Sequence, residues 1–319
     1  MVAYGDLVMQ VPRGRAVASG TGSPGGSLAV SLQRAATIAA VKAPPESFFV
    51  VSAVFHYLGP AFAVLLFARV EPLGVAWLRI ASAAAIFLLW RRPWRSFRVR
   101  TAEEKRLLVA WGTVLAVMNA TFYLAIERLP LGTVAAVEFL PVVALGALGA
   151  RSVRNGAALL LAVSGVYLVT DVRIAGDPLG FGFAFANALL FALYIVLGHR
   201  LASKGASAGI DGLAAAMLVA AVVATPLGGW AVIPVLTDPL ALAAGAGVGI
   251  SSSVIPYVTD QLAMARITRA TYALMVSLLP ATATVVGIVV LAQVPSWVEV
   301  FGVSLVIGGV AVHRGREAA

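Results

Sequence analysis

The sequence predicts an all-α membrane protein in which ten transmembrane helices form two inverted five-helix repeats. Three observations lead to this fold class. The 319-residue chain is 61% hydrophobic and 12% charged, whereas a soluble domain is nearer half apolar and a quarter charged. Its apolar residues fall into runs long enough to span a bilayer, and its basic residues gather on one side of those runs. A helix with an internal proline also recurs in the two halves of the chain.

The apolar runs are expected to be helices because lipid offers backbone N–H and C=O groups no hydrogen-bond partner. Several of them are short or interrupted by Gly and Pro. The expected helices span roughly 48–67, 72–90, 107–126, 131–150, 156–170, 179–198, 210–232, 240–264, 271–291 and 297–312.

The net charge of +9 would suit a nucleic-acid partner, but its distribution indicates membrane topology instead. If the N-terminus is cytoplasmic and each run crosses once, only Arg69, Arg128 and Arg173 fall in outer connections, and Arg79 lies within a run. The remainder of the 23 Lys and Arg residues lie on the cytoplasmic side, as the positive-inside rule requires. We therefore expect a multi-pass protein with both termini in the cytoplasm and no nucleic-acid partner.

The domain organisation follows from the same runs. Residues 1–46 are rich in Gly, Ser, Pro and Arg, so they are expected to be a disordered cytoplasmic extension. They lack the apolar core of a secretory signal peptide. The first five-helix repeat is expected at 47–175, the second at 176–313, and a cytoplasmic tail at 314–319.

Internal similarity supports the division into two repeats. The segment VAAVEFLPVVALGALGA (134–150) resembles ALMVSLLPATATVVGIVV (273–290), with Pro141 and Pro280 at matching places. Because each half has an odd number of spans, the halves are expected to sit in the membrane with opposite orientations. Inverted repeats of this kind are typical of transporters that bind substrate near the midplane. The alternative is a duplication that serves packing alone.

Two charged residues lie inside the apolar runs. A charge at the bilayer centre costs about 2.5–3.5 kcal/mol even on insertion scales, so such residues are candidates for function. Arg79 and Glu138 both lie about seven residues from the outer end of their runs, or roughly 10 Å at 1.5 Å per residue. They are expected either to form a structural ion pair or to line a substrate cavity. There the guanidinium could bind a carboxylate, and the glutamate an ammonium group or a proton.

Uncharged and titratable residues are expected to join them. His56 is near the middle of the first run, where it is either a packing residue or a substrate contact. Asn119 and Tyr123 are four residues apart and share a helix face, and Asn187 and Tyr194 are seven apart and do likewise. Each pair is expected either to contact substrate or to form interhelical hydrogen bonds.

The eighth run carries SSSVIPYVTDQ at 251–261. Pro256 and the serines predict a locally irregular helix, which is tolerated at membrane depth where it lines a cavity. Asp260 is expected near the cytoplasmic boundary, either as a solvated helix end or as a proton site at an inner gate.

The sequence offers no cofactor or catalytic signature. It contains no cysteine, so thiolate chemistry and disulfides are excluded. The three histidines, His56, His199 and His313, are too scattered for a metal site. The GAGVG stretch at 245–249 lacks the spacing of a dinucleotide-binding motif. We therefore expect no enzyme activity, no cofactor and no metal.

Several segments resemble the EamA-type ten-helix branch of the drug/metabolite transporter superfamily, and within it the bacterial threonine/homoserine exporters. The resemblance runs from about 51 to 313. It is carried by GPAFAVLLFARVEPLGVAWLRIASAAAIFLLWRRPWR (59–95), ERLPLGTVAAVEF (127–139), ALYIVLGHR (192–200) and VIPYVTDQLAMARITRATYALMVSLLP (254–280). Its most specific part is the placing of Arg79, Glu138, Tyr194, Pro256 and Tyr257.

The chain departs from the pattern of this family in a few places, most of them in its second half. Similar exporters have Glu where this chain has Asp260, and often Glu where it has Leu279. The superfamily commonly has Gly-Glu where this chain has Ala292-Gln293. A Gly often found before the fourth-helix Pro is Leu140.

The resemblance implies export of small metabolites or amino acids across the bacterial inner membrane, driven by a secondary gradient that involves protons. We expect the substrate carboxylate at Arg79 and its ammonium group at Glu138, with a proton competing for Glu138 or Asp260. An exporter of drugs or hydrophobic metabolites is an alternative, and a non-transport membrane enzyme or scaffold is another. The protein is expected to be a monomer or a homodimer. The expected pocket is completed by His56, Asn119, Tyr123, Asn187, Tyr194 and Tyr257.

Overall fold

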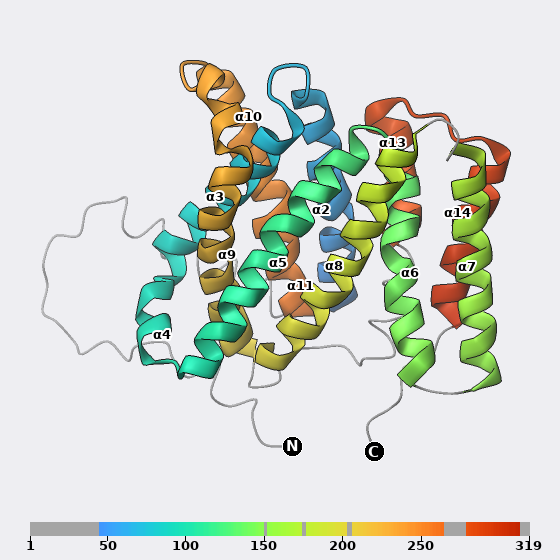
Figure 1. Cartoon of the computed structure of the whole chain (residues 1–319), viewed down its shortest axis with the longest axis horizontal. Helices are drawn as coiled ribbons and strands as arrows, with labels where there is room; N and C mark the ends of the chain where they lie inside the picture. Colours follow the sequence, from blue (N-terminus) through green and yellow to red (C-terminus); the bar gives the residue numbers. More distant parts are fainter. Residues whose placement is uncertain (1–44, 150–151, 174–176, 203–205, 265–278, 313–319) are drawn as a thin grey trace, which may run out of the picture. The chain divides into compact units, whose positions relative to one another are not determined.

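The regular structure of this protein is helical. A computed structural model describes residues 45–149, 152–173, 177–202, 206–264 and 279–312. Within these ranges the chain forms helices and no strands (Figure 1), which confirms the all-α class. The expected N-terminal extension, up to residue 44, and the expected tail lie outside the described residues.

The helices follow one another with short connections. They are α2 (Pro45–Leu66), α3 (Pro72–Arg91), α4 (Pro93–Val99), α5 (Ala102–Ile126), α6 (Leu131–Gly149), α7 (Val153–Arg173), α8 (Pro178–Ala202), α9 (Ala206–Gly228), the 3₁₀ helix η1 (Gly229–Val235), α10 (Pro239–Gly249), the π-helix η2 (Ile250–Val254), α11 (Ile255–Met264), α13 (Leu279–Leu291) and α14 (Trp297–Val312).

Five stretches of the described chain are long and apolar enough to cross a membrane. They are Pro72–Arg91, Ala102–Ile126, Pro178–Gly198, Ile210–Val235 and Pro239–Thr259. Shorter apolar helices occupy the places of the other expected spans: Val50–Leu66, Leu131–Pro141, Val153–Leu168, Leu279–Leu291 and Trp297–Gly309. By length and composition alone, half of the ten expected crossings are therefore established.

Side chains cap the N-termini of several helices. Thr101 accepts a hydrogen bond from the backbone N–H of Glu104, whose carboxylate accepts from the N–H of Thr101 in return. Ser296 and Glu299 form the same reciprocal pair at the start of α14. Such capping boxes satisfy backbone donors that have no partner within the helix. The buried Glu299 is thus explained by helix capping.

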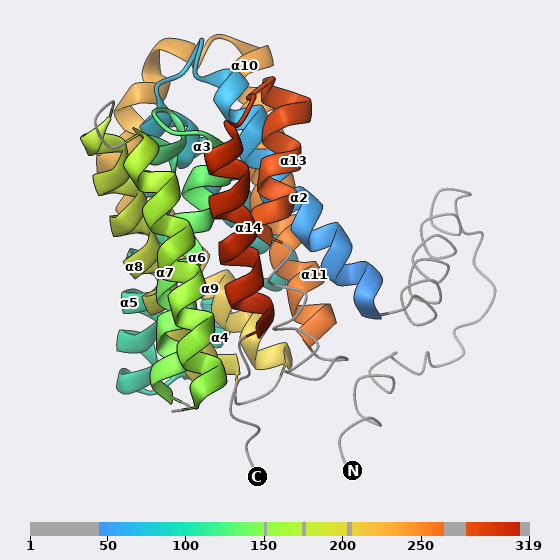
Figure 2. The ribbon, with the colours of Figure 1, turned by 90° about the vertical axis from the view of Figure 1, so that its right-hand side faces the viewer.

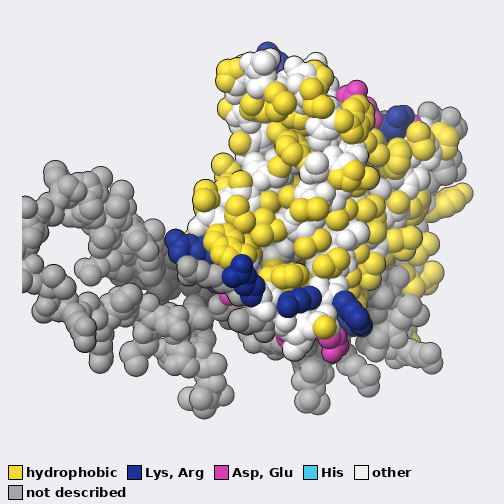
Figure 3. Space-filling view, turned by 60° about the vertical axis from the view of Figure 1, so that its left-hand side comes forward, with side chains coloured by type: hydrophobic (Ala, Val, Ile, Leu, Met, Phe, Trp, Pro, Cys, Tyr) yellow, Lys and Arg dark blue, Asp and Glu magenta, His cyan; other side chains and the backbone are white. Residues whose placement is uncertain are grey.

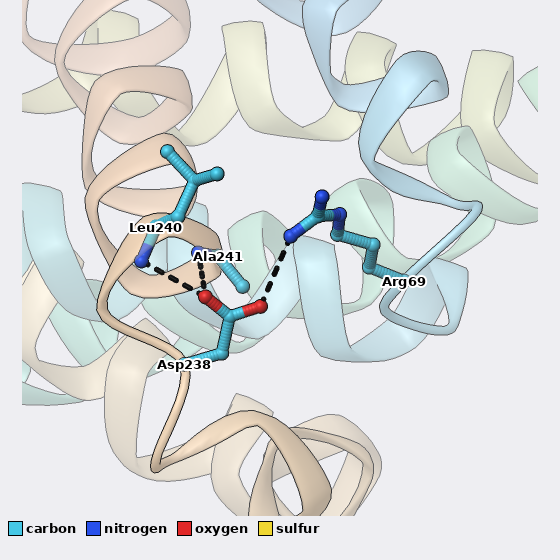
Figure 4. A network of polar contacts seen from close by, with 4 residues as sticks. All are labelled: Arg69, Asp238, Leu240 and Ala241. Atoms are coloured by element: carbon cyan, nitrogen blue, oxygen red, sulfur yellow. Dashed lines mark hydrogen bonds and ion pairs between the residues drawn. The ribbon is translucent and has the colours of Figure 1, made fainter.

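Asp238 caps α10 and also binds an arginine from the end of α2 (Figure 4). Its Oδ1 accepts hydrogen bonds from the N–H groups of Leu240 and Ala241 at 2.9 and 3.1 Å. Its Oδ2 lies 3.1 Å from Nη1 of Arg69. The bond from Ala241, with those from Leu240 and Arg69, holds the pKa of this carboxyl below its ordinary value. The network links α2 to α10 at one end of the bundle.

The helices pack in a regular scheme of pairs. Helix α5 packs along α8, and α2 packs along α11; α6 also contacts α8, and α2 contacts α13. Three further pairs join α3 to α9, α6 to α13 and α7 to α14. Figures 1 and 2 show α7 and α14 side by side in both views. Every pair except that of α2 with α11 or α13 joins an element of the first half to one of the second in the same way, and those two pairs do so as well, so the halves are packed against each other throughout.

The surface of the bundle is apolar along its sides. Figure 3 shows a face covered mainly by hydrophobic side chains, with Lys and Arg side chains gathered along its lower edge. Large apolar residues are strongly exposed, for example Leu89 at 80%, Leu189 at 67% and Val289 at 76%. Soluble monomers rarely expose continuous apolar surface of this extent. The sides of the bundle therefore suit a lipid environment.

Candidate functional site

Arg79 on α3 lies buried between helices, with 5% of its surface exposed. Its Nε donates to Oγ of Ser253 at 2.9 Å, and its Nη2 donates to the backbone oxygen of Ser252 at 2.9 Å. The guanidinium also lies over the ring of Tyr123 on α5, 5.7 Å from the centroid. Among the described residues, no hydrogen bond engages Nη1 of Arg79. The arginine is thus held firmly but keeps donors for another partner.

The carbonyl of Ser252 is available to Arg79 because of the local sequence. In an α-helix, the N–H of residue 256 would donate to the carbonyl of residue 252. Residue 256 is a proline, which has no N–H, and the chain forms the π-helix Ile250–Val254 just before it. The expected irregularity of this stretch is therefore confirmed, and it places a free carbonyl and two serine hydroxyls opposite Arg79.

Small residues let neighbouring helices approach this irregular stretch closely. A Cβ atom at Gly59 on α2 would collide with the side chain of Ser252 and lie 2.8 Å from its backbone nitrogen. A Cβ atom at Gly249 would lie 2.7 Å from the backbone oxygen of Arg79. Ser52 on α2 also donates to the backbone oxygen of Pro256 at 3.2 Å. Helices α2, α3 and η2 therefore form one tightly packed unit around the arginine.

Glu138 on α6 is the buried acid of the site, with 4% of its surface exposed. Its Oε1 accepts a hydrogen bond from Nδ2 of Asn187 on α8 at 3.0 Å. Its Oε2 and Oδ1 of Asn187 are both buried and have no hydrogen-bond partner in the described part of the chain. The side chains thus present two adjacent acceptors with no donor between them.

Arg79 and Glu138 do not form the direct ion pair that the sequence left open as an alternative. The ion pairs found within 4.0 Å among the described residues do not include them. Each charge instead has its own partners, the serines for Arg79 and Asn187 for Glu138. They remain close enough to interact electrostatically. The two charges therefore stand apart inside one buried region.

Further polar atoms around these charges are buried without a partner. They are Oη of Tyr57, Oη of Tyr123 and Oγ of Ser252, and Nε1 of Trp111 shares this property. Native proteins satisfy nearly all buried polar groups, so each exception asks for an explanation. Several exceptions around two buried charges are typical of a site that completes its hydrogen bonds with a ligand.

Aromatic side chains extend the site along α8. Tyr194 stacks on Phe191 and on Tyr257, with ring centroids 6.4 and 6.2 Å apart. Trp111 approaches Tyr194 at 5.6 Å, and Phe191 meets Phe139, the neighbour of Glu138, at 5.9 Å. The expected residues Tyr194 and Tyr257 therefore belong to a continuous aromatic wall.

The remaining expected residues lie in different settings. Asn119 is buried, but its Nδ2 donates to the backbone oxygen of Leu115 on its own helix at 2.8 Å. His56 is half-buried and meets the ring of Tyr57 edge-on at 5.3 Å. Asp260 lies on α11, but its side chain is outside the described residues. The structure thus joins Arg79 and Tyr123 directly, and joins Glu138 to Asn187.

Sequence reasoning missed three polar residues of this region, Tyr57, Ser252 and Ser253. The serines carried a signal, because they precede Pro256 in a run expected to be irregular. Tyr57 carried none beyond its place beside His56, since an aromatic residue in an apolar run is ordinary. Its burial and its unpartnered hydroxyl become visible only when the helices are packed.

Two hollows of the described structure lie away from this region. One of about 540 Å³ runs between α2 and α10 and is lined by apolar residues with Arg69 at its end. The other, of about 170 Å³, lies between α6, α13 and α14. There the side chain of Gln293 accepts a hydrogen bond from the N–H of Leu131 at 3.1 Å and so caps α6. The polar site itself is closed to solvent.

Comparison with known proteins agrees with these features. Residues 178–314 match the EamA-like transporter family. The chain is 30% identical over 263 residues to the threonine/homoserine exporter RhtA of Escherichia coli (strain K12), which covers 78% of this chain and 84% of that protein. The same exporter of Salmonella typhimurium (strain LT2) is 30% identical over 262 residues, with the same coverage.

A solved crystal structure shows the same fold. It aligns with a TM-score of 0.56 and 20% identity, over 84% of this chain and 97% of that chain. An all-helical apolar bundle with buried charges, a family match in the second half and exporter relatives along most of the chain lead to one assignment. This chain belongs to the EamA-like transporter family of the drug/metabolite transporter superfamily, whose members here are membrane proteins related to bacterial threonine/homoserine exporters.

Proposed function

We propose that this protein exports small zwitterionic metabolites, namely amino acids such as threonine and homoserine, across the bacterial inner membrane. One observation carries the proposal: Arg79 and Glu138 are both buried, are not paired with each other, and both keep hydrogen-bonding atoms unengaged. A site with a separate cation and anion matches a ligand with a separate carboxylate and ammonium group. The names of the exporter relatives point to the same class of ligand.

The carboxylate of the substrate would bind at Arg79. Nε and Nη2 are held by the serines of η2, so the guanidinium is fixed in orientation and presents Nη1. The hydroxyl of Tyr123, beside the guanidinium, supplies a further donor. Hydrogen bonds between a guanidinium and a carboxylate are about twice as strong as neutral ones.

The ammonium group of the substrate would bind at Glu138 and Asn187. The free Oε2 of Glu138 and the free Oδ1 of Asn187 are acceptors, and an ammonium group offers only donors. The bond from Nδ2 of Asn187 to Oε1 orients both side chains. A substrate bound this way would satisfy polar atoms that are otherwise buried without partners.

Proton coupling follows from competition for the same carboxylate. A buried, unpaired carboxylate is costly in a membrane protein, so Glu138 would carry a proton when the substrate is absent. Binding of an ammonium group would displace that proton. Asp260 is the second candidate proton site. Export of one amino acid in exchange for an inward-moving proton would result.

Alternating access is supported by the packing scheme. If the halves 47–175 and 176–313 are inverted repeats, exchanging them turns the α5–α8 pair into the α11–α2 pair and the α6–α8 pair into the α13–α2 pair. These contacts are all present. Because the polar site is closed to solvent, the halves would have to rock apart on one side at a time, as inverted-repeat carriers do. The proposed orientation places α4 and both termini in the cytoplasm.

Flux in proteoliposomes tests this proposal. Threonine, homoserine and a mixture of amino acids would be supplied with and without a pH gradient, to the unchanged protein and to Glu138→Gln and Arg79→Gln. We expect gradient-driven flux that both substitutions abolish. The exposed pair Glu103→Gln and Arg106→Gln is the matched control and should transport normally. Normal flux in the folded Glu138→Gln and Arg79→Gln variants would show that the site is misplaced.

The aromatic wall favours a second candidate, an exporter of drugs or hydrophobic metabolites. Stacked rings of Phe191, Tyr194 and Tyr257 suit flat apolar compounds as well as they suit a pocket wall. A toxicity panel in a strain that overproduces the protein separates the two. Resistance to toxic amino-acid analogues alone supports the first candidate, and resistance to apolar drugs supports the second.

A further inference from the structure

Tyr57 is a buried polar residue that the proposed binding of carboxylate and ammonium groups does not use. It lies on α2, is fully buried, and contacts the ring of His56 edge-on. Its hydroxyl has no hydrogen-bond partner in the described part of the chain. Tyrosine hydroxyls that are buried usually find a partner, so the position asks what the hydroxyl binds.

The surroundings place this hydroxyl on the Glu138 side of the site. It is close enough to the Glu138 carboxylate to interact with it electrostatically. On either side along α2, Ser52 donates to the backbone of Pro256, and Gly59 packs against Ser252. Helix α2 is thereby fixed on η2 and α11, and Tyr57 is held with it. The phenol is therefore a rigid element of the region that holds the charges.

We propose that the hydroxyl of Tyr57 recognises a hydroxyl group on the side chain of the substrate and so selects hydroxylated amino acids. This inference rests on the proposed function of the site. Arg79 accounts for the carboxylate, and the acceptors of Glu138 and Asn187 account for the ammonium group. What remains is a phenol, which can both donate and accept, as a hydroxyl partner requires.

Substrate geometry agrees with this role. The hydroxyl is on the β-carbon in threonine and on the γ-carbon in homoserine, so in both it lies near the ammonium end of the molecule. Tyr57 lies near Glu138, where the ammonium group would bind. The relatives are named as exporters of these two amino acids, and one hydroxyl partner near the ammonium site would serve both. Sites that hydrogen-bond a substrate hydroxyl reject analogues that lack it far more strongly than apolar pockets reject a missing methylene.

The test compares matched substrates in a matched set of variants. Threonine is paired with valine, and homoserine with norvaline, because the second member of each pair has a methyl group in place of the hydroxyl. Flux of all four is measured for the unchanged protein, Tyr57→Phe, Tyr123→Phe and Tyr167→Phe. Tyr123 is on the carboxylate side of the site, and Tyr167 is exposed on α7.

We expect the unchanged protein to prefer the hydroxylated member of each pair by at least about tenfold. In Tyr57→Phe this preference should fall to less than about threefold, mainly through lower threonine and homoserine flux. Tyr123→Phe should lower the flux of all four substrates alike, and Tyr167→Phe should change none. Added threonine should raise the melting temperature of the unchanged protein but not that of Tyr57→Phe.

Each other outcome would overturn the inference. A folded Tyr57→Phe with an unchanged preference would show that the phenol does not read the hydroxyl. A Tyr57→Phe that loses thermal stability without ligand would show that the hydroxyl has a structural partner, since its removal should cost no internal hydrogen bond. A protein that transports no amino acid at all would refute the proposed function first. In that case the preference could not arise, and this inference would fall with it.

Discussion

Nη2 of Arg79 donates to the backbone oxygen of Ser252 at 2.9 Å, although 173 positions separate the two residues. The carbonyl is available because Pro256 has no N–H to offer it. One proline thus creates an acceptor for a buried cation, and the cation in turn satisfies a carbonyl that the helix cannot. The structure couples a backbone irregularity to the orientation of the proposed substrate ligand.

This coupling predicts the effect of Pro256→Ala. The new N–H would compete with Arg79 for the carbonyl of Ser252, so amino-acid flux should fall about tenfold, as expected when a hydrogen bond to a charged group of about 1.5 kcal/mol is lost. Removal of an interior helix proline should meanwhile raise thermal stability, by up to about 3 kcal/mol. Flux assays and thermal unfolding measure the two effects. Pro226→Ala in α9, away from the site, should raise stability without lowering flux, and equal flux in both variants would contradict the prediction.

Gly59→Ala tests the close contact between α2 and η2. The new methyl group would collide with Ser252, and overpacking of this kind typically costs about 1–3 kcal/mol. Thermal unfolding in detergent would show the loss, and flux should fall because α2 can no longer hold the site. Gly182→Ala on α8 is the control, since a Cβ atom there meets nothing within 4 Å. That variant should be more stable by about 0.5–1 kcal/mol, and an equal response of the two glycines would speak against the contact.

Gln293 is predicted to stabilise α6 from outside that helix. Its side chain accepts the N–H of Leu131 at the helix start, and loss of an N-terminal cap costs about 1 kcal/mol. Gln293→Ala should therefore lower the free energy of unfolding by about that amount. Gln293→Glu keeps the acceptor and adds a negative charge at a helix N-terminus, so it should be at least as stable as the unchanged protein. A stable Gln293→Ala variant in urea or thermal unfolding would remove the capping role.

The lowered pKa of Asp238 predicts a contribution to stability that depends on pH. Because the folded-state pKa lies below the ordinary value, this contribution is complete above about pH 4 and is lost as pH falls through the lower, folded-state pKa. Asp238→Asn keeps a capping side chain but has no titrating group. Thermal unfolding between pH 6 and 3 should therefore show a shallower acid loss in the variant. Parallel curves would show that the contacts in Figure 4 do not hold the carboxylate ionised.

The sequence by itself determined the class of this protein and the residues that most need explaining. Apolar runs leave a chain in lipid no choice but helices, and charges within such runs are costly wherever the helices pack. Arg79 and Glu138 could therefore be named in advance. The irregular eighth run could also be predicted, because a proline removes a helical donor in any context.

The partners of these residues were decided only by the tertiary structure. Equal depth along two helices allowed Arg79 and Glu138 to pair, but pairing also depends on how each helix is rotated and on what lies between them. The packed helices give Arg79 the serines of η2 and give Glu138 the amide of Asn187. The burial of the Tyr57 hydroxyl and the capping of α6 by Gln293 arise in the same way. Each depends on contacts between residues far apart in the chain, for which a linear pattern carries no signal.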